Sequence, residues 1–173
     1  MQPSCVLLIE DDPILLDTMS SSLRLKMPQA HIETAESVLT SLERIRSVEY
    51  AAIVADAQQP RLEGVAYVRA VHKIHPQCPV LLLVEKHQED LFRQAMDAGA
   101  YDVLVKPVEE GTLLFAVRRA IEVSRLRRQV KHEEAQFVVS VGQVMKDLEV
   151  LYGAYGLQSH FEAFMGDGRG ERA

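Results

Sequence analysis

The sequence predicts an α/β fold, with a parallel β-sheet covered by helices on both faces. Short apolar runs typical of buried strands alternate five times with segments of helical spacing. The connections between these segments are short, and such alternation is typical of parallel sheets. The pattern alone does not fix the order of the strands. A chain of 173 residues is long enough for one domain with a sizeable core and a modest appendage.

Five strands are expected, over residues 6–9, 30–35, 50–56, 80–84 and 102–105. Three of them end in charged side chains. The first is followed by Glu10, Asp11 and Asp12, the apolar central strand ends in Asp56, and the last leads into Lys106. In open α/β sheets, ligands bind at the carboxyl ends of the strands. These side chains therefore suggest a site for a divalent cation and a phosphoryl group.

Five helices are expected, over residues 13–27, 37–47, 65–75, 91–98 and about 113–130. Pro13 suits the first turn of a helix, where its missing N–H is not needed. Gly99 follows the fourth helix in the position of a left-handed cap. Ile14 shares the helical spacing of the first helix, and Met96 is expected in the core.

A heptad-like apolar stripe follows the domain-facing part of the last helix. Its members are Phe137, Val141, Val144, Leu148, Leu151 and Tyr155. The basic segment 125–131, which precedes the stripe, is expected to be a solvated linker face. Gly142 lies within the stripe and would allow another helix to approach closely. The predicted division is a domain over 1–125, a helical extension over 126–165 and a disordered tail over 166–173. The extension either folds back on the domain or forms a dimerisation hairpin or coiled coil.

Composition excludes several classes of function. No apolar run approaches the roughly 20 residues that span a bilayer, and the N-terminus lacks the basic start of a signal peptide, so we expect no membrane insertion and a cytoplasmic location. From Lys131 onward there are seven acidic and four basic residues, which argues against direct DNA binding. Cys5 and Cys78 are expected to be reduced. The histidines show neither ligand spacing nor a carboxylate context, and surface or packing roles are expected for them.

The clustered charges have a chemical interpretation. Mg²⁺ prefers oxygen ligands, which two carboxylates from neighbouring strands and a backbone carbonyl after the central strand would supply. A lysine opposite them would neutralise a phosphoryl oxygen as a point charge. Asp56 could then act as a nucleophile that forms an acyl phosphate.

Three segments, in this order and at these separations, resemble a response-regulator receiver domain of bacterial two-component signalling. They are residues 8–13, 56–64 and 98–107, and the resemblance covers residues 5 to about 125. It implies a flavodoxin-like (βα)5 domain with strand order 2-1-3-4-5. It also implies a set of roles: a phosphoacceptor at Asp56, an acidic Mg²⁺ pair at Glu10 and Asp11, a backbone carbonyl ligand at Gln58 and a phosphoryl partner at Lys106. Asp12 either joins the acidic set or simply caps the first helix.

The chain departs from the family pattern at the positions that normally report phosphorylation. The family usually has Ser or Thr where Val84 stands, a small residue at Glu85 and an aromatic residue at Val103. Valine has the shape of threonine but no hydroxyl. Tyr101 lies two residues before Val103, and strand alternation predicts that both share one face. The acidic site and Lys106 thus match the family pattern, while the two positions that normally report phosphorylation are Val84 and Val103.

Two functions are consistent with these observations. The first is a response regulator that a histidine kinase or a histidine phosphotransfer protein phosphorylates on Asp56 with Mg²⁺, and that relays the signal by protein–protein interaction. It would not be an enzyme, beyond slow self-phosphoryl transfer and self-dephosphorylation. The second is a phosphorylation-independent receiver that acts as a dimerisation or interaction module, through a homodimer over 126–165. An unrelated α/β phosphatase is disfavoured because every loop is short.

Overall fold

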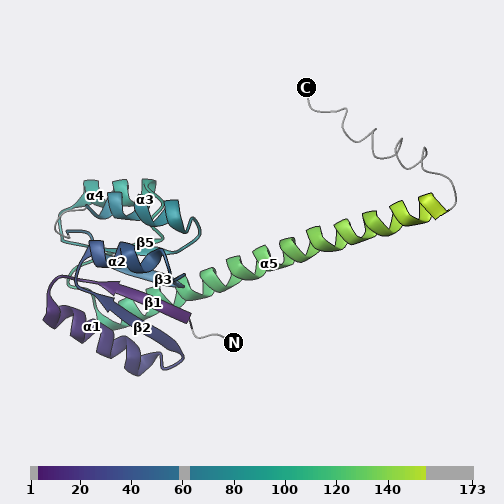
Figure 1. Cartoon of the computed structure of the whole chain (residues 1–173). Coiled ribbons are helices and arrows are strands. Elements are labelled where there is room, and N and C mark those ends of the chain that lie inside the picture. The colour runs from purple at the N-terminus through teal and green to yellow at the C-terminus, as the bar shows by residue number, and fades with distance from the viewer. Residues whose placement is uncertain (1–3, 59–62, 155–173) are drawn as a thin grey trace. The chain divides into compact units, whose positions relative to one another are not determined.

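The computed structural model describes residues 4–58 and 63–154, and the chain divides into two units, residues 1–127 and residues 128–173. Within the described residues, strands and helices alternate along the chain (Figure 1). They are β1 (Ser4–Ile9), α1 (Pro13–Lys26), β2 (Ala30–Ala35), α2 (Val38–Ile45), β3 (Ala52–Asp56), α3 (Gly64–Ile74), β4 (Val80–Val84), α4 (Glu89–Asp97), β5 (Asp102–Val105) and α5 (Glu110–Ala154).

The five strands form one parallel sheet in the order β2-β1-β3-β4-β5, which confirms the predicted fold class and strand order. In the register of the central strands, Ile9 of β1 is the Cα partner of both Ala35 in β2 and Ala55 in β3. Every residue of β3 and β4 is buried, as expected for strands covered on both faces. Because all strands run the same way, their carboxyl ends meet at one edge of the sheet.

Helices cover both faces of this sheet, as predicted. On one face, α1 and the first part of α5 pack against the strands through Leu16, Leu23 and Val117. On the other face, α2, α3 and α4 pack through residues such as Val68 and Ala95. Alternate residues of β4 enter the two clusters, so this strand is apolar throughout rather than alternating.

A close backbone approach fixes the start of α3 beside the carboxyl end of β3. A Cβ atom added to Gly64 would lie 2.8 Å from the Cα atom of Ala57. The Gly64 N–H donates a hydrogen bond of 3.0 Å to the Ala57 carbonyl. A glycine at this position therefore holds the loop after Asp56 close to the helix that follows it.

One residue that shares the helical spacing of α1 faces solvent, and one expectation about a core residue was wrong. Ile14 is 78% exposed, and Leu16 turns to the sheet instead. The two residues lie about 200° apart around the helix axis, so they cannot both face the core. Met96 is 43% exposed, because its neighbour Ala95 occupies the buried face of α4.

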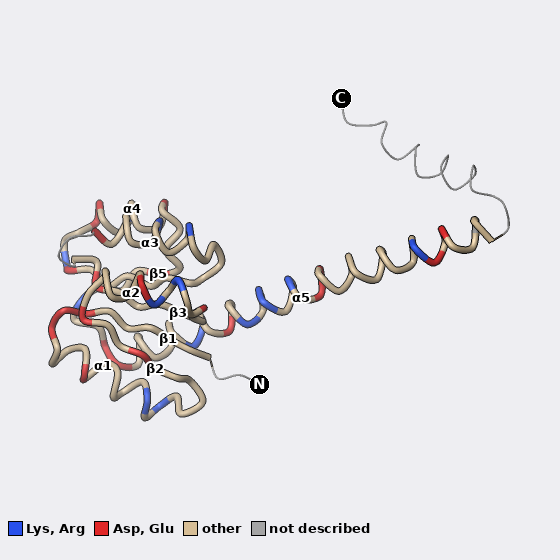
Figure 2. The backbone as a smooth tube through the Cα atoms, in the orientation of Figure 1, with Lys and Arg blue, Asp and Glu red and all other residues tan. Residues whose placement is uncertain are grey.

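The last helix is longer than predicted. It begins at Glu110 rather than near Leu113 and continues to Ala154, so the basic segment 125–131 and the start of the apolar stripe belong to one helix. Figure 2 shows the charged part of α5 followed by an uncharged stretch, which comprises residues 135–145. Tyr155, the remainder of the predicted extension and the predicted tail lie outside the described residues. No helix among the described residues is long and apolar enough to cross a membrane.

Within unit 2, apolar side chains of the stripe are exposed. Phe137 is 70% exposed, and Val141, Val144 and Leu151 are also exposed. A Cβ atom added to Gly142 would meet nothing within 4 Å. Exposed apolar surface of this extent is typical of interaction sites.

Candidate functional site

Three acidic side chains meet at the carboxyl end of the sheet. Glu10 directly follows β1 and Asp56 ends the neighbouring strand β3, while Asp11 is the next residue after Glu10. One carboxylate oxygen from each of the three lies within 4.8 Å of the others. Glu10 is 2% exposed and Asp56 is 7% exposed, whereas Asp11 is exposed to solvent. The structure therefore brings together three of the four acids that the sequence singled out.

Lys106 reaches this cluster from the end of β5, two strands away from β3. Its Nζ atom lies 3.2 Å from Oε2 of Glu10 and 3.2 Å from Oδ2 of Asp56. The peptide bond between Lys106 and Pro107 is cis. One largely buried ammonium group thus bridges the two buried carboxylates.

Burial and charge act against each other in this cluster. Burial raises the pKa of Glu10 above its usual range, although the N–H of Asp12 and the ammonium of Lys106 oppose this shift. Burial alone would lower the pKa of Lys106, but the neighbouring carboxylates of Asp56 and Glu10 outweigh it and raise that pKa. The lysine is therefore held in its charged form, and two acids share its charge.

Backbone N–H groups orient the buried carboxylates. The N–H groups of Asp11 and Asp12 lie 3.1 and 3.3 Å from Oε1 of Glu10, to which they donate. The N–H of Gln58 donates to Oδ1 of Asp56 at 3.2 Å. These contacts fix the carboxylate positions and place Gln58 beside the cluster.

Asp12 caps helix α1, which is one of the two roles expected for it. Its Oδ1 atom accepts hydrogen bonds from the N–H groups of Ile14 at 2.9 Å and Leu15 at 3.2 Å. These are N–H groups of the first turn of α1 that have no partner within the helix. The side chain is thus occupied at the helix start, and the acidic cluster comprises Glu10, Asp11 and Asp56 without it.

The oxygen donors suit a hard divalent cation. Mg²⁺ is bound in proteins by one or two carboxylates and keeps several waters. Two buried carboxylates that share one lysine retain excess negative charge, and the exposed Asp11 leaves the cluster open to solvent. The arrangement can bind a cation and present an Asp56 oxygen to an electrophilic phosphorus.

Both atypical valines belong to the core. Val84, at the end of β4, is 2% exposed, and Val103 in β5 is 6% exposed. They lie in the same apolar cluster, on the face covered by α2, α3 and α4. Tyr101 packs against the cluster on the other face, so the prediction that it shares a face with Val103 was wrong. Tyr101 precedes β5, and the alternation of the strand does not extend to it.

Glu85 adds a third acid near the lysine. Its Oε1 atom lies 4.0 Å from Nζ of Lys106, and its side chain is about half exposed. The Glu85 N–H donates to Oε1 of Gln88 at 3.1 Å, across a loop in which His87 has a φ of 70°. The residue that replaces the usual small side chain thus lies within electrostatic range of the site.

Histidine contacts were predicted only in part. His72 and His75 have packing roles: their Nε2 atoms lie 3.1 Å from the carbonyl of Cys78 and 2.7 Å from that of Ile45. The expectation that no histidine has a carboxylate context was wrong for His31, whose Nε2 atom lies 3.5 Å from Oε1 of Glu33. The alternation of His31 and Glu33 along β2 was the available signal, because residues i and i+2 of a strand share a face.

Comparison with known proteins gives a consistent picture. The family model described as the response regulator receiver domain matches residues 6–118. The C4-dicarboxylate transport transcriptional regulatory protein DctD of Pseudomonas aeruginosa is 34% identical over 128 residues, which cover 70% of this chain and 26% of that protein. The response regulator protein FleR of the same species is 33% identical over 115 residues, which cover 66% of this chain and 24% of that protein. The chain therefore spans about a quarter of the length of these relatives.

Solved structures also superpose on most of this chain. A response regulator receiver domain protein from Clostridium thermocellum superposes with a TM-score of 0.65 at 26% identity, over 71% of this chain and 98% of that one. NtrX from Brucella abortus, solved in complex with ATP, superposes with a TM-score of 0.67 at 25% identity. That match covers 75% of this chain and 29% of NtrX.

Proposed function

The chain belongs to the response regulator receiver domain family of two-component systems, and from this premise we propose that it is a signalling domain phosphorylated on Asp56. The observation that carries the proposal is the buried Asp56 carboxylate, held 3.2 Å from the Lys106 ammonium and within 4.8 Å of the other two acids. A carboxylate positioned between a cation site and a lysine is suited to nucleophilic attack on phosphorus. The phosphodonor we propose is a histidine kinase or a histidine phosphotransfer protein.

The proposed transfer uses few protein groups. A carboxylate oxygen of Asp56 attacks the phosphorus of a phosphohistidine, the P–N bond breaks, and the imidazole leaves with the bonding electron pair and takes up a proton. Lys106 stabilises the negative oxygens of the transferred group, and its ammonium is already held at the site by Glu10 and Asp56. Asp56 takes part once per phosphorylation, so the chain acts as a phosphoacceptor rather than as an enzyme that turns over a substrate.

Receiver domains typically use Mg²⁺ at an acidic pocket, and the residues present fit this ion. We assign its binding to Asp11, Asp56, Glu10 through water, and the backbone carbonyl of Gln58. All of these donors are oxygen atoms, which Mg²⁺ prefers. The bound ion supplies positive charge that lowers the repulsion between Asp56 and an incoming phosphoryl group.

The usual relay of the phosphorylated state is not supported by this chain's residues. Val84 has no hydroxyl to bond a phosphoryl oxygen, and Val103 has no aromatic ring to move. Both side chains are packed in the core instead. We propose that phosphorylation is transmitted by the charge change around Lys106 and Glu85 to a protein partner.

A second function is favoured by the exposed apolar stripe on α5. A receiver that is joined to a dimerising helix can act as an interaction module whether or not Asp56 is phosphorylated. Phe137, Val141 and Val144 are all exposed and recur with heptad-like spacing. In this alternative, residues 126–165 form the homodimer contact and the acidic site has no signalling role.

Acetyl phosphate tests the first proposal. Incubation with acetyl phosphate and Mg²⁺ should add one phosphoryl group to the wild-type chain, measured by intact mass, and should add none to Asp56→Asn. Asp17→Asn, an exposed carboxylate change on α1, should be labelled like the wild type. Phosphorylation of Asp56→Asn, or no labelling of the wild type by acetyl phosphate or any histidine kinase, would overturn the proposal.

A further inference from the structure

A second cluster of potential ligands lies near the amino end of β1, away from the acidic site. Cys5 of β1 and His31 of β2 are Cα partners in the parallel register, and Glu33 follows two residues along β2. Cys5 and Glu10 are separated by about 16 Å of extended strand, at roughly 3.3 Å per residue. The cluster is therefore distinct from the phosphoacceptor site.

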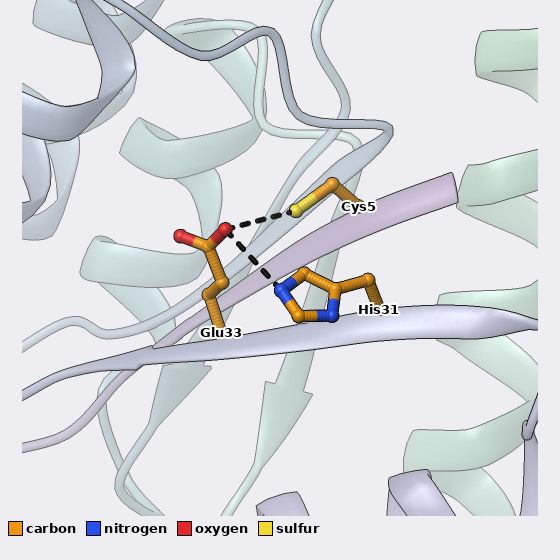
Figure 3. A group of neighbouring side chains, drawn as sticks. All are labelled: Cys5, His31 and Glu33. Atoms are coloured by element: carbon orange, nitrogen blue, oxygen red, sulfur yellow. Dashed lines mark hydrogen bonds and ion pairs between the residues drawn. The ribbon is translucent and has the colours of Figure 1, made fainter. Parts of the chain in front are cut away.

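The three side chains converge on one point. Oε1 of Glu33 lies 3.5 Å from Sγ of Cys5 and 3.5 Å from Nε2 of His31 (Figure 3). The sulfur, nitrogen and oxygen atoms all lie within 4.8 Å of one another. In a tetrahedral zinc site, with Zn–S of about 2.3 Å and Zn–O of about 2.0–2.2 Å, the sulfur–oxygen separation is about 3.5 Å. The observed sulfur–oxygen separation therefore matches that of two ligands around a single ion.

A further hydrogen bond orients the carboxylate. The buried Tyr50 hydroxyl donates to Oε2 of Glu33 at 2.7 Å, which leaves Oε1 turned toward Cys5 and His31. Hydrogen-bonded partners of this kind commonly fix the orientation of metal ligands.

The chemistry of the donors selects the class of ion. Thiolate and imidazole are soft to borderline ligands that favour first-row transition ions such as Zn²⁺ over Mg²⁺. We propose that Cys5, His31 and Glu33 form a binding site for a borderline divalent cation, zinc foremost, with one coordination position open to water or a partner. His31 is 64% exposed at its side chain, so the ion can enter from solvent.

Cobalt provides the test, because a thiolate bound to Co²⁺ gives a near-ultraviolet charge-transfer band. We expect the full chain, reduced and with excess Mg²⁺ to saturate the acidic site, to develop this band at one Co²⁺ per chain and to lose it on addition of Zn²⁺. Cys5→Ala should abolish the band, and His31→Ala, a change at an exposed position, should weaken Co²⁺ binding at least tenfold. Tyr50→Phe should keep the band with about tenfold weaker binding.

Matched variants separate this site from others that could bind the ion. Cys78→Ala removes the buried cysteine and should leave the band unchanged. Asp11→Asn alters the acidic cluster and should also leave the band unchanged. Circular dichroism of Cys5→Ala reports whether that variant is folded, and His31→Ala provides an independent result. The proposal is overturned if the wild type shows no band, if the band survives in Cys5→Ala, or if His31→Ala binds Co²⁺ as tightly as the wild type.

Discussion

The carboxylate of Glu85 lies 4.0 Å from the ammonium of Lys106, the same group that bridges Glu10 and Asp56 at 3.2 Å. One cation is therefore shared among three acids. A phosphoryl group on Asp56 would add negative charge to this set, and Lys106 would be drawn toward it. Because Glu85 is about half exposed, its attraction for Lys106 is screened by solvent and is small.

Removal of Glu85 should make phosphorylation of Asp56 faster. In Glu85→Ala, Lys106 loses one competing acid, and the incoming phosphoryl group meets less negative charge. An exposed pair is worth about 0.2–1 kcal/mol, which corresponds to a rate increase of up to about fivefold with acetyl phosphate. Glu89→Ala, at the exposed start of α4, should leave the rate unchanged. A rate in Glu85→Ala equal to or below that of the wild type would contradict this electrostatic account.

Restoration of a hydroxyl at position 84 should couple the core to the phosphorylated state. Val84 follows Leu83, the Cα partner of Asp56, and is 2% exposed. A buried hydroxyl without a partner costs about 1–3 kcal/mol, so Val84→Thr should lower the free energy of urea unfolding by this amount. Beryllofluoride, which mimics the acyl phosphate, should recover part of the loss by offering the hydroxyl an acceptor.

Val80→Thr is the matched control for this prediction. Val80 lies on the same strand and in the same apolar cluster, at the end remote from Asp56. It should show a similar loss of stability and no recovery with beryllofluoride. An equal response of the two variants to beryllofluoride would show that the position of the hydroxyl relative to Asp56 does not matter.

Binding of Mg²⁺ should depend on pH through Glu10. Burial raises the pKa of Glu10, so the free chain keeps a proton there to a higher pH than an ordinary glutamate. Since Mg²⁺ requires the carboxylate, binding releases this proton, and affinity should rise with pH until Glu10 is fully ionised and then level off. The slope is at most about tenfold per pH unit for one proton.

Calorimetric titration with Mg²⁺ at a series of pH values, from below to above the ionisation of Glu10, provides the measurement. Glu10→Gln should bind Mg²⁺ more weakly and with a flatter pH profile, because no proton is released at that position. Glu43→Gln, a change on α2 away from the cluster, should keep the wild-type profile. If Glu10→Gln retains the full pH dependence, another group is responsible for it.

The sequence was sufficient to predict the fold and the grouping of the acidic site. Strands buried on both faces are apolar throughout, so β3 and β4 were recognisable, and the charged residues at strand ends had to meet at one edge of a parallel sheet. The strand order that places Lys106 near Asp56 came from the resemblance to receiver domains, because the pattern alone does not fix that order.

What could not be predicted depended on strand starts and on register. Tyr101 was placed on the wrong face because β5 begins one residue after it, so the alternation of the strand does not extend to Tyr101. Ile14 and Leu16 are both apolar, and only the packing of α1 on the sheet decides which is buried. Cys5 meets His31 through the pairing of β1 with β2, which no pattern within either segment specifies.

The apolar stripe on α5 should determine the oligomeric state. If residues 137–151 form a helical dimer contact, sedimentation should show a dimer for the full chain and a monomer for a chain that ends at Val130. Val144→Glu places a charge within the stripe and should raise the dimer Kd at least tenfold, about 1.4 kcal/mol, whereas Gln143→Glu adds the same charge beside it and should not. A dimer that persists in Val144→Glu would contradict this contact. Beryllofluoride then separates the two functions. A change in the dimer Kd on its addition would show that dimerisation responds to the state of Asp56. An unchanged dimer Kd would favour the phosphorylation-independent module.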